Sequence, residues 1–200
     1  MNNFLEKIER NFDTISFERK KVLQSLAEFI QKKQNLEEDI NLLYVCTHNS
    51  RRSHFGQIAA LISSVYYGVE KVHVFSGGTE VTGFHPNAIK ALKKISFEIT
   101  SDNGIENPIY RIDFGGVQSI WCFSKVYNHE QNPKSNFVAI MTCSDAETNC
   151  PFIPGEELRI ATTYADPKIA DGTSKQDQTY SDRFTQIATE TLYVFSLIKK

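Results

Sequence analysis

The chain has 200 residues, of which 40% are hydrophobic, 12% aromatic and 23% charged, a composition typical of globular proteins. Its 22 Lys and Arg residues against 24 Asp and Glu residues give a net charge of -2, so no basic field predicts binding to nucleic acid or to an anionic membrane. The longest apolar runs, such as residues 137–141, are too short to cross a bilayer. The charged start of the chain also differs from a signal peptide, so we expect a cytoplasmic protein.

Two runs of apolar residues at helical spacing occupy the N-terminal part of the chain. The first extends from Phe4 to Ile15 and the second from Val22 to Ile30, with Ser16 between them as a predicted N-cap. Charged residues fill the other faces. We therefore expect an N-terminal helical extension, residues 1–36, that forms a hairpin packed on a main domain of residues 37–200. An arm that binds a partner is the alternative.

Strands and helices alternate through the main domain. The pattern predicts strands at residues 40–45, 71–75, 119–123, 137–142 and 159–163, and helices at residues 53–67, 86–95 and 180–198. The first of these strands is almost wholly apolar, as expected for a parallel strand that is buried on both faces. The order predicts an α/β fold, a single doubly wound domain with a mainly parallel four-stranded sheet and helices on both faces.

The segment from Leu42 to Ser53 reads as a strand, a cysteine, a polar loop and the start of a helix. Cys46 is thereby predicted at the carboxyl end of a strand, where open α/β sheets bind ligands. Amides of a loop that leads into a helix converge on an anion and also favour a thiolate, so we expect Cys46 to be a nucleophile with a lowered pKa. Arg52 is placed to bind two oxygens of a tetrahedral oxyanion, and Ser53 to donate a hydrogen bond to the sulfur. The alternative is a buried cysteine beside a surface arginine.

This Cys-x5-Arg-Ser segment resembles the phosphate-binding loop of the low-molecular-weight protein tyrosine phosphatase superfamily, which includes the thioredoxin-coupled arsenate reductases. The resemblance extends to Ser76-Gly77-Gly78-Thr79 and to His85-Pro86, and it covers about residues 40–198. It implies the fold of that superfamily and an oxyanion site that needs no cofactor and no metal. The loop residues implied in substrate binding are Thr47, His48, Asn49, Ser50, Arg51 and Ser53.

Two residues depart from the family pattern. His48 occupies a loop position that is usually glycine, although histidine accepts a positive φ better than most residues do. Gln57 stands where the family usually has a glutamate, which helps to hold a potassium ion in some of the reductases. That ion is therefore not carried over to this chain.

A second pair of cysteines marks the predicted strand at residues 137–142. Cys143 follows this strand and is expected at the same sheet edge as Cys46, and a polar, loop-like segment then leads to Cys150. Zinc ligation fits poorly, because the spacing is not Cys-x2-Cys and no histidine is near in the sequence. The stretch Thr142–Pro151 resembles the redox segment of the arsenate reductases, which implies that Cys143 and Cys150 are catalytic. Two inert cysteines that flank a loop are the alternative.

Cys122 differs from these three cysteines, since it lies inside the predicted strand at residues 119–123. We expect it to pack as a small buried hydrophobe. Ser124 and Lys125 follow at the functional edge, where they would contact substrate or cap the strand.

Asp166-Pro167 is the only Asp-Pro pair in the chain. Both branches of the superfamily carry an Asp-Pro on a loop near the active site. The resemblance implies that Asp166 protonates the leaving alcohol in a phosphatase, or assists the loss of hydroxide from arsenate in a reductase. An ordinary turn is the alternative, because both residues favour turns.

The resemblance implies an arsenate reductase in which Cys46, Cys143 and Cys150 form a relay that thioredoxin resets. The alternative enzyme is a low-molecular-weight protein tyrosine phosphatase, which would need only Cys46, Arg52 and Asp166 to hydrolyse phosphotyrosine or another phosphomonoester. A third hypothesis is a non-enzymatic oxyanion sensor or adaptor whose N-terminal helices recruit a partner.

Overall fold

The computed structural model describes residues 2–102, 104, 106–115, 118–149 and 152–199. Its helices are α1 (Asn2–Glu9), η1 (Phe12–Thr14), α2 (Phe17–Asn35), α3 (Arg52–Tyr67), α4 (Pro86–Lys94), α5 (Ser144–Asn149), η2 (Pro167–Ala170) and α6 (Gln176–Ser196). Its strands are β1 (Ile40–Cys46), β2 (Val72–Gly78), β3 (Glu98–Ser101), β4 (Tyr110–Asp113), β5 (Ser119–Cys122), β6 (Phe137–Met141) and β7 (Glu156–Ala161). Within these residues, no helix is both long and apolar enough to cross a membrane.

The main sheet has the strand order β2-β1-β6-β7 with every pair parallel, which confirms the predicted four-stranded parallel sheet. Side chains of β1 alternate between its two faces. Leu42 and Tyr44 join the core beneath α2 and α6, whereas Leu43 and Val45 join the core beneath α5. Val45 pairs with Met141 of β6, so both strands end at one edge of the sheet.

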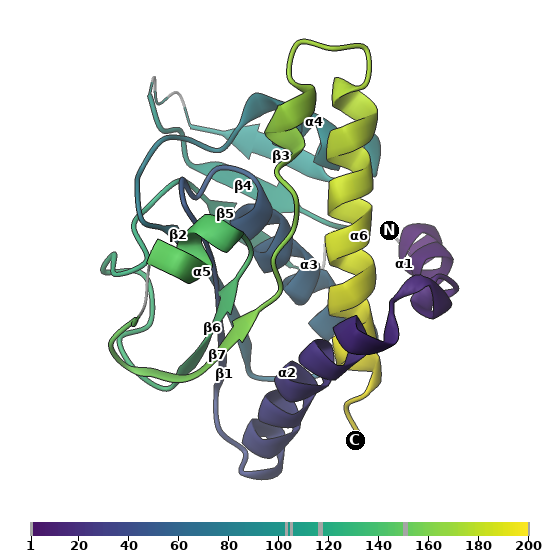
Figure 1. Ribbon diagram of the computed structural model, residues 1–200, viewed down its shortest axis with the longest axis vertical. Helices are drawn as coiled ribbons and strands as arrows, with labels where there is room; N and C mark the ends of the chain where they lie inside the picture. The colour runs from purple at the N-terminus through teal and green to yellow at the C-terminus, as the bar shows by residue number, and fades with distance from the viewer. Residues whose placement is uncertain (1, 103, 105, 116–117, 150–151, 200) are drawn as a thin grey trace.

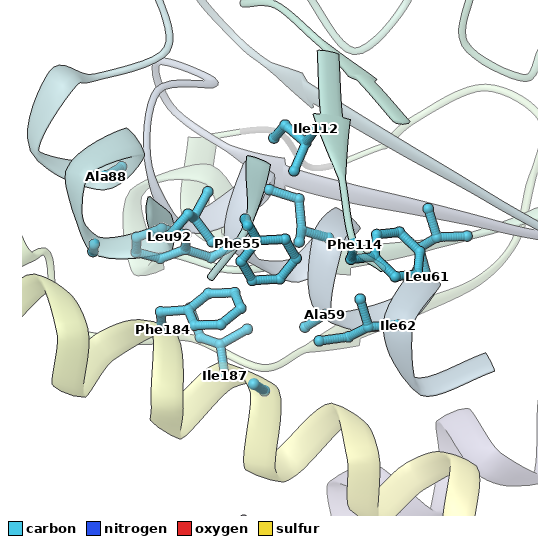
Figure 2. Packing of buried hydrophobic residues seen from close by; sticks show 14 of the residues in the cluster. Phe55, Ala59, Leu61, Ile62, Ala88, Leu92, Ile112, Phe114, Phe184 and Ile187 are labelled. Carbon is cyan, nitrogen blue, oxygen red and sulfur yellow. The ribbon is translucent and has the colours of Figure 1, made fainter. Parts of the chain in front are cut away.

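Helix α3 packs between the sheet and α6 (Figure 1). Figure 2 shows Phe55 and Ile62 of α3 facing Phe184 and Ile187 of α6. The rings of Phe55 and Phe184 meet edge to face with centroids 5.2 Å apart, a geometry that aromatic pairs favour. This core fixes α3, whose first turn follows the Cys46 loop (residues 46–52).

The N-terminal helices α1 and α2 pack along α6, and α2 also contacts β7 and β1 (Figure 1). Leu23, Leu26 and Ile30 of α2 are buried in the same hydrophobic cluster as Leu42 of β1. The predicted N-cap is confirmed, because Ser16 Oγ accepts a hydrogen bond from a backbone N–H in the first turn of α2. One apolar core therefore joins α2 to the sheet.

A second sheet, in the antiparallel order β3-β4-β5, corrects the place expected for residues 119–123. This segment is a strand as predicted, but it pairs with β4 and not with the parallel sheet. Its residues alternate between buried and exposed, and Trp121 is 59% exposed, which is the pattern of a strand with one face toward solvent. The strands β3 and β4 were not predicted, because each has only four residues and the two strands together bury a single side chain.

Residues 144–149, which we expected to form a loop, instead form the short helix α5. The sequence hides this helix because Ala146 is its one buried apolar residue among those described, so no helical period is visible. Asp145 and Glu147 lie in the first turn, where the helix dipole favours negative charge. The helix begins directly after Cys143, whose sulfur accepts a hydrogen bond from Ala146 N at 3.3 Å.

Gly56 sets how closely α3 approaches β1. A Cβ at this position would lie 2.2 Å from Cδ1 of the buried Tyr44 ring, so α3 would have to shift. We expect Gly56→Ala to lower the free energy of unfolding by about 1–3 kcal/mol, although alanine is the better helix former. Urea unfolding measures the change.

Ser63→Ala on the same helix is the matched control. It removes a hydroxyl that has no hydrogen-bond partner among the described residues, and it should change stability little. Equal stability of Gly56→Ala and the natural protein would contradict the close approach of α3 to Tyr44.

Candidate active site

Cys46 ends β1 and is 3% exposed. Its Sγ lies 3.1 Å from Ser53 Oγ, in the first turn of α3. Ser53 Oγ also accepts a hydrogen bond from Asn49 Nδ2 at 2.8 Å, which leaves the hydroxyl hydrogen of Ser53 free to point at the sulfur. Ser53 can therefore donate a hydrogen bond to Cys46 Sγ, the contact expected from the sequence.

The left-handed residue of the Cys46 loop is Asn49, with φ of 43°. Asparagine tolerates this conformation better than most residues. His48 therefore needs no positive φ, although it replaces the usual glycine. Its ring is 45% exposed and lies 3.4 Å from the carboxylate of Glu80.

Neighbouring segments brace the loop. Lys125 N donates to Asn49 Oδ1 at 2.8 Å, and Ser124 Oγ donates to the carbonyl of His48 at 3.0 Å. Ser50 Oγ donates to a carbonyl oxygen as well, at 2.7 Å. Ser124 and Lys125 thus support the loop, a role different from the substrate contact and the strand cap considered from the sequence.

The backbone of the loop holds unused donors. Among the described residues, no protein acceptor takes a hydrogen bond from the N–H groups of residues 47–51. Most side chains of this segment bond to the protein itself. The loop can therefore offer an oxyanion a set of backbone N–H groups next to the N-terminus of α3, and this is the arrangement that binds phosphate-like anions.

Arg52 and Asp166 lie together, as expected for two residues of one site. Arg52 Nη2 donates to Asp166 Oδ2 at 2.7 Å, and Nη1 donates to the carbonyl of Tyr164 at 2.9 Å. Arg52 is 7% exposed, and its Nε has no hydrogen-bond partner within the described part of the chain. A buried guanidinium with an unused N–H can still donate a hydrogen bond to a bound anion.

Arg51 is held differently from Arg52. Its Nε donates to the hydroxyl of Tyr180 on α6 at 2.8 Å, and its Nη2 lies 3.7 Å from Asp171 Oδ2. Burial raises the pKa of Tyr180 to about 12, so its hydroxyl keeps a proton, which it donates to Asp171 at 2.8 Å. That Arg51 contacts the substrate stays a prediction. In the structure its side chain joins the loop to α6 through Tyr180.

Cys143 lies two residues beyond the end of β6, beside the Cys46 loop. It is fully buried, and its Sγ lies 3.5 Å from Thr47 Oγ1. Cys46 and Cys143 belong to one hydrophobic cluster, so the two thiols lie at the same sheet edge, as expected. Cys150 lies outside the described residues.

Cys122 is fully buried, and burial raises the pKa of its thiol to about 12 although Lys125 nearby opposes this shift. It stays protonated at neutral pH and packs in the core, as predicted. Gln57 lies beside it, with Gln57 Oε1 3.8 Å from the sulfur. In the described parts of the chain, no group of three or more His, Cys, Asp or Glu residues is arranged to hold a metal ion.

A cleft of about 600 Å³ borders the outer side of the loop. His48, Ser50 and Arg51 form one wall, and Phe84 and Tyr110 contribute aromatic rings. The cleft gives room beside the candidate anion site for an organic group.

Sequence reasoning missed Tyr164, Tyr180 and Asp171, which hold the arginines of the loop. They lie far from the Cys46 motif in the chain. One feature of the sequence could have indicated Tyr180. It lies at the start of the apolar stripe of α6, and a buried hydroxyl there needs a hydrogen-bond partner. No feature indicated Tyr164 and Asp171 beyond their closeness in sequence to Asp166.

Comparison with known proteins identifies relatives of this chain by sequence. No model of a known protein family matches it. It is 30% identical over 135 residues to an arsenate reductase of Bacillus cereus, and the match covers 66% of this chain and 80% of the relative. It is 28% identical over 155 residues to an arsenate reductase of Oceanobacillus iheyensis, covering 78% of this chain and 94% of that relative.

Among solved structures, a low molecular weight phosphotyrosine phosphatase from Vibrio cholerae is similar, with a TM-score of 0.50 at 14% sequence identity. The match covers 78% of this chain and 94% of the phosphatase, and it supports the fold alone. The sequence relatives show that the chain is an enzyme. The chain belongs to the low-molecular-weight protein tyrosine phosphatase superfamily and lies close to its arsenate reductases.

Proposed function

We propose that this enzyme reduces arsenate, with Cys46 as the nucleophile and Cys143 as the second thiol. The observation that carries the proposal is the position of Cys143, which is buried at the end of β6 with its Sγ 3.5 Å from Thr47 Oγ1 of the Cys46 loop. Phosphoester hydrolysis needs one sulfur only, whereas reduction by thiols needs two. The arsenate reductases among the sequence relatives support the same activity.

In the first step, the Cys46 thiolate attacks arsenic and an oxygen leaves. The N–H groups of residues 47–51 and the guanidinium of Arg52 stabilise the charged transition state. Asp166, 2.7 Å from Arg52, gives the departing hydroxide a proton so that it leaves as water. The product is arsenic(V) bound to the Cys46 sulfur.

In the second step, the Cys143 thiolate attacks Cys46 Sγ. A sulfur–sulfur bond forms, the sulfur–arsenic bond breaks, and its electron pair goes to arsenic, which leaves as arsenite. Two thiols are oxidised and arsenic is reduced by two electrons, so the step balances. Cys150, placed by the sequence resemblance, then attacks Cys143 and frees Cys46. An external dithiol protein of the thioredoxin type reduces the final Cys143–Cys150 disulfide.

Hydrolysis of phosphomonoesters such as phosphotyrosine is a second candidate function. The observation that favours it is the cleft of about 600 Å³ beside the loop, which has room for a leaving group much larger than hydroxide. This reaction uses Cys46, Arg52 and Asp166 and passes through a cysteinyl-phosphate. Both reactions need the same anion site, so phosphatase activity can accompany arsenate reduction.

Cys143→Ser separates the two functions. We expect it to stop multiple-turnover arsenate reduction in the presence of thioredoxin, because no second thiol is left to attack Cys46 Sγ and release arsenite. Hydrolysis of aryl phosphates should stay within about twofold of the natural enzyme, since that chemistry uses one sulfur. Arsenite formation and phosphate release measure the two activities.

Two further cysteine variants are the controls for Cys143→Ser. Cys46→Ser should abolish both activities, while Cys122→Ser, at a buried position of β5, should retain both. The reductase proposal is wrong if the natural enzyme forms no arsenite with thioredoxin present yet hydrolyses phosphotyrosine efficiently.

Asp166→Asn tests the general acid. We expect kcat/KM for phenyl phosphate, a poor leaving group, to fall about 100-fold, and that for dinitrophenyl phosphate to fall far less. Asp171→Asn is the matched control, because Asp171 contacts Arg51 and not Arg52, and it should affect the two esters equally. Equal losses on both esters for Asp166→Asn would remove the acid role.

A further inference from the structure

Helix α2 of the N-terminal segment reaches the candidate active site through Arg19. Its Nε donates to Glu190 Oε2 on α6 at 2.8 Å, and its Nη2 donates to the carbonyl of Thr163 at 3.4 Å. The guanidinium also lies over the Tyr164 ring, 4.7 Å from its centroid. Arg19 therefore contacts two consecutive residues of the segment that leads to Asp166.

Tyr164 links Glu190 to Arg52 in the candidate active site. Its hydroxyl donates to Glu190 Oε2 at 2.7 Å, the same oxygen that Arg19 binds. Its carbonyl accepts from Arg52 Nη1 at 2.9 Å, and Arg52 Nη2 binds Asp166. A continuous set of contacts thus runs from α2 to the proposed acid.

The segment that carries Asp166 needs such anchors. Residues 162–166 belong to no helix or strand, so no regular ladder of hydrogen bonds fixes them. Two backbone bonds to the end of β6, from the N–H groups of Thr162 and Tyr164, hold its first half. The position of Asp166 itself then depends on how Tyr164 and Arg52 are held.

Charge makes Arg19 the central anchor. Glu190 is 5% exposed, and a carboxylate this deeply buried is stable only beside a cation or strong donors. Among the described residues, Arg19 is the one cation within ion-pair distance of it. Without Arg19, Glu190 would lose its charge partner, and the hold on the Tyr164 hydroxyl would weaken.

We propose that Arg19 is a positioning residue for Asp166, so that the N-terminal helical segment helps to build the active site. The N-cap Ser16 helps to position Arg19, because its Oγ accepts a hydrogen bond from Arg19 N at the start of α2. This inference rests on the proposed acid role of Asp166. Arg19 is proposed to affect the position of Asp166, and not Cys46 or the anion-binding loop.

The test is the dependence of kcat/KM on the leaving group in the full-length chain. Arg19→Met should lower kcat/KM for phenyl phosphate about tenfold and that for dinitrophenyl phosphate less than about twofold, because only the first needs the proton. Arg19→Lys should recover part of the loss. On phenyl phosphate, Arg19→Met combined with Asp166→Asn should be no slower than Asp166→Asn alone, since both changes remove one function.

Lys21→Met, an exposed position on the same helix, is the matched control and should behave as the natural enzyme. Tyr164→Phe removes the hydroxyl that joins the segment to Glu190, and it should show the same leaving-group preference even if Arg19→Met folds poorly.

Equal losses on both esters in Arg19→Met and Tyr164→Phe, with a selective loss in Asp166→Asn, would overturn the inference while leaving the acid role intact. A loss without selectivity in Asp166→Asn would overturn the acid role, and this inference with it.

Discussion

The parallel pairing of β1 with β6 is the constraint on which the site depends. It aligns Val45 with Met141, so the ends of the two strands lie side by side. Cys46 is the last residue of β1 and Cys143 lies two residues beyond β6, so two cysteines 97 positions apart in sequence become neighbours at one sheet edge. Because β1 and β2 are parallel, α3 forms the crossover between them, and its N-terminus directly follows the short loop after Cys46. One register therefore fixes both the anion-binding loop and the second thiol.

Around this edge the enzyme buries several charges, and each is matched by a specific partner. Arg52 binds Asp166, Arg51 binds Tyr180 and lies near Asp171, and Arg19 binds Glu190. Burying a charge is unfavourable unless a partner compensates it, so these contacts restrict where the loop segments can lie. The partners come from α2, α6 and residues 162–171, which ties the long C-terminal helix to the catalytic loop. The desolvation of these charges is the cost of a rigid, preorganised site.

The sequence predicted best where the chemistry is local. The strand, cysteine, loop and helix of residues 42–67 follow one another in the chain, so their pattern predicted both the fold and the place of Cys46 and Arg52. The parallel sheet followed from its apolar strands. The antiparallel strands β3 and β4 and helix α5 escaped prediction because they bury too few side chains to create a period. The partners Tyr164, Tyr180 and Asp171 escaped for another reason, since only folding brings them near residues 51 and 52.

The apolar core shared by α2 and β1 has a practical consequence for anyone who shortens the chain. The sequence motifs that resemble the family begin at about residue 40, and this invites a fragment that starts there. In such a fragment, Leu42 and Ile140 would lose the cover that Leu23, Leu26 and Ile30 now provide. The part of this apolar cluster that α2 covers would then meet solvent, and exposed apolar surfaces drive aggregation. The limit of family likeness is thus no limit of the folding unit.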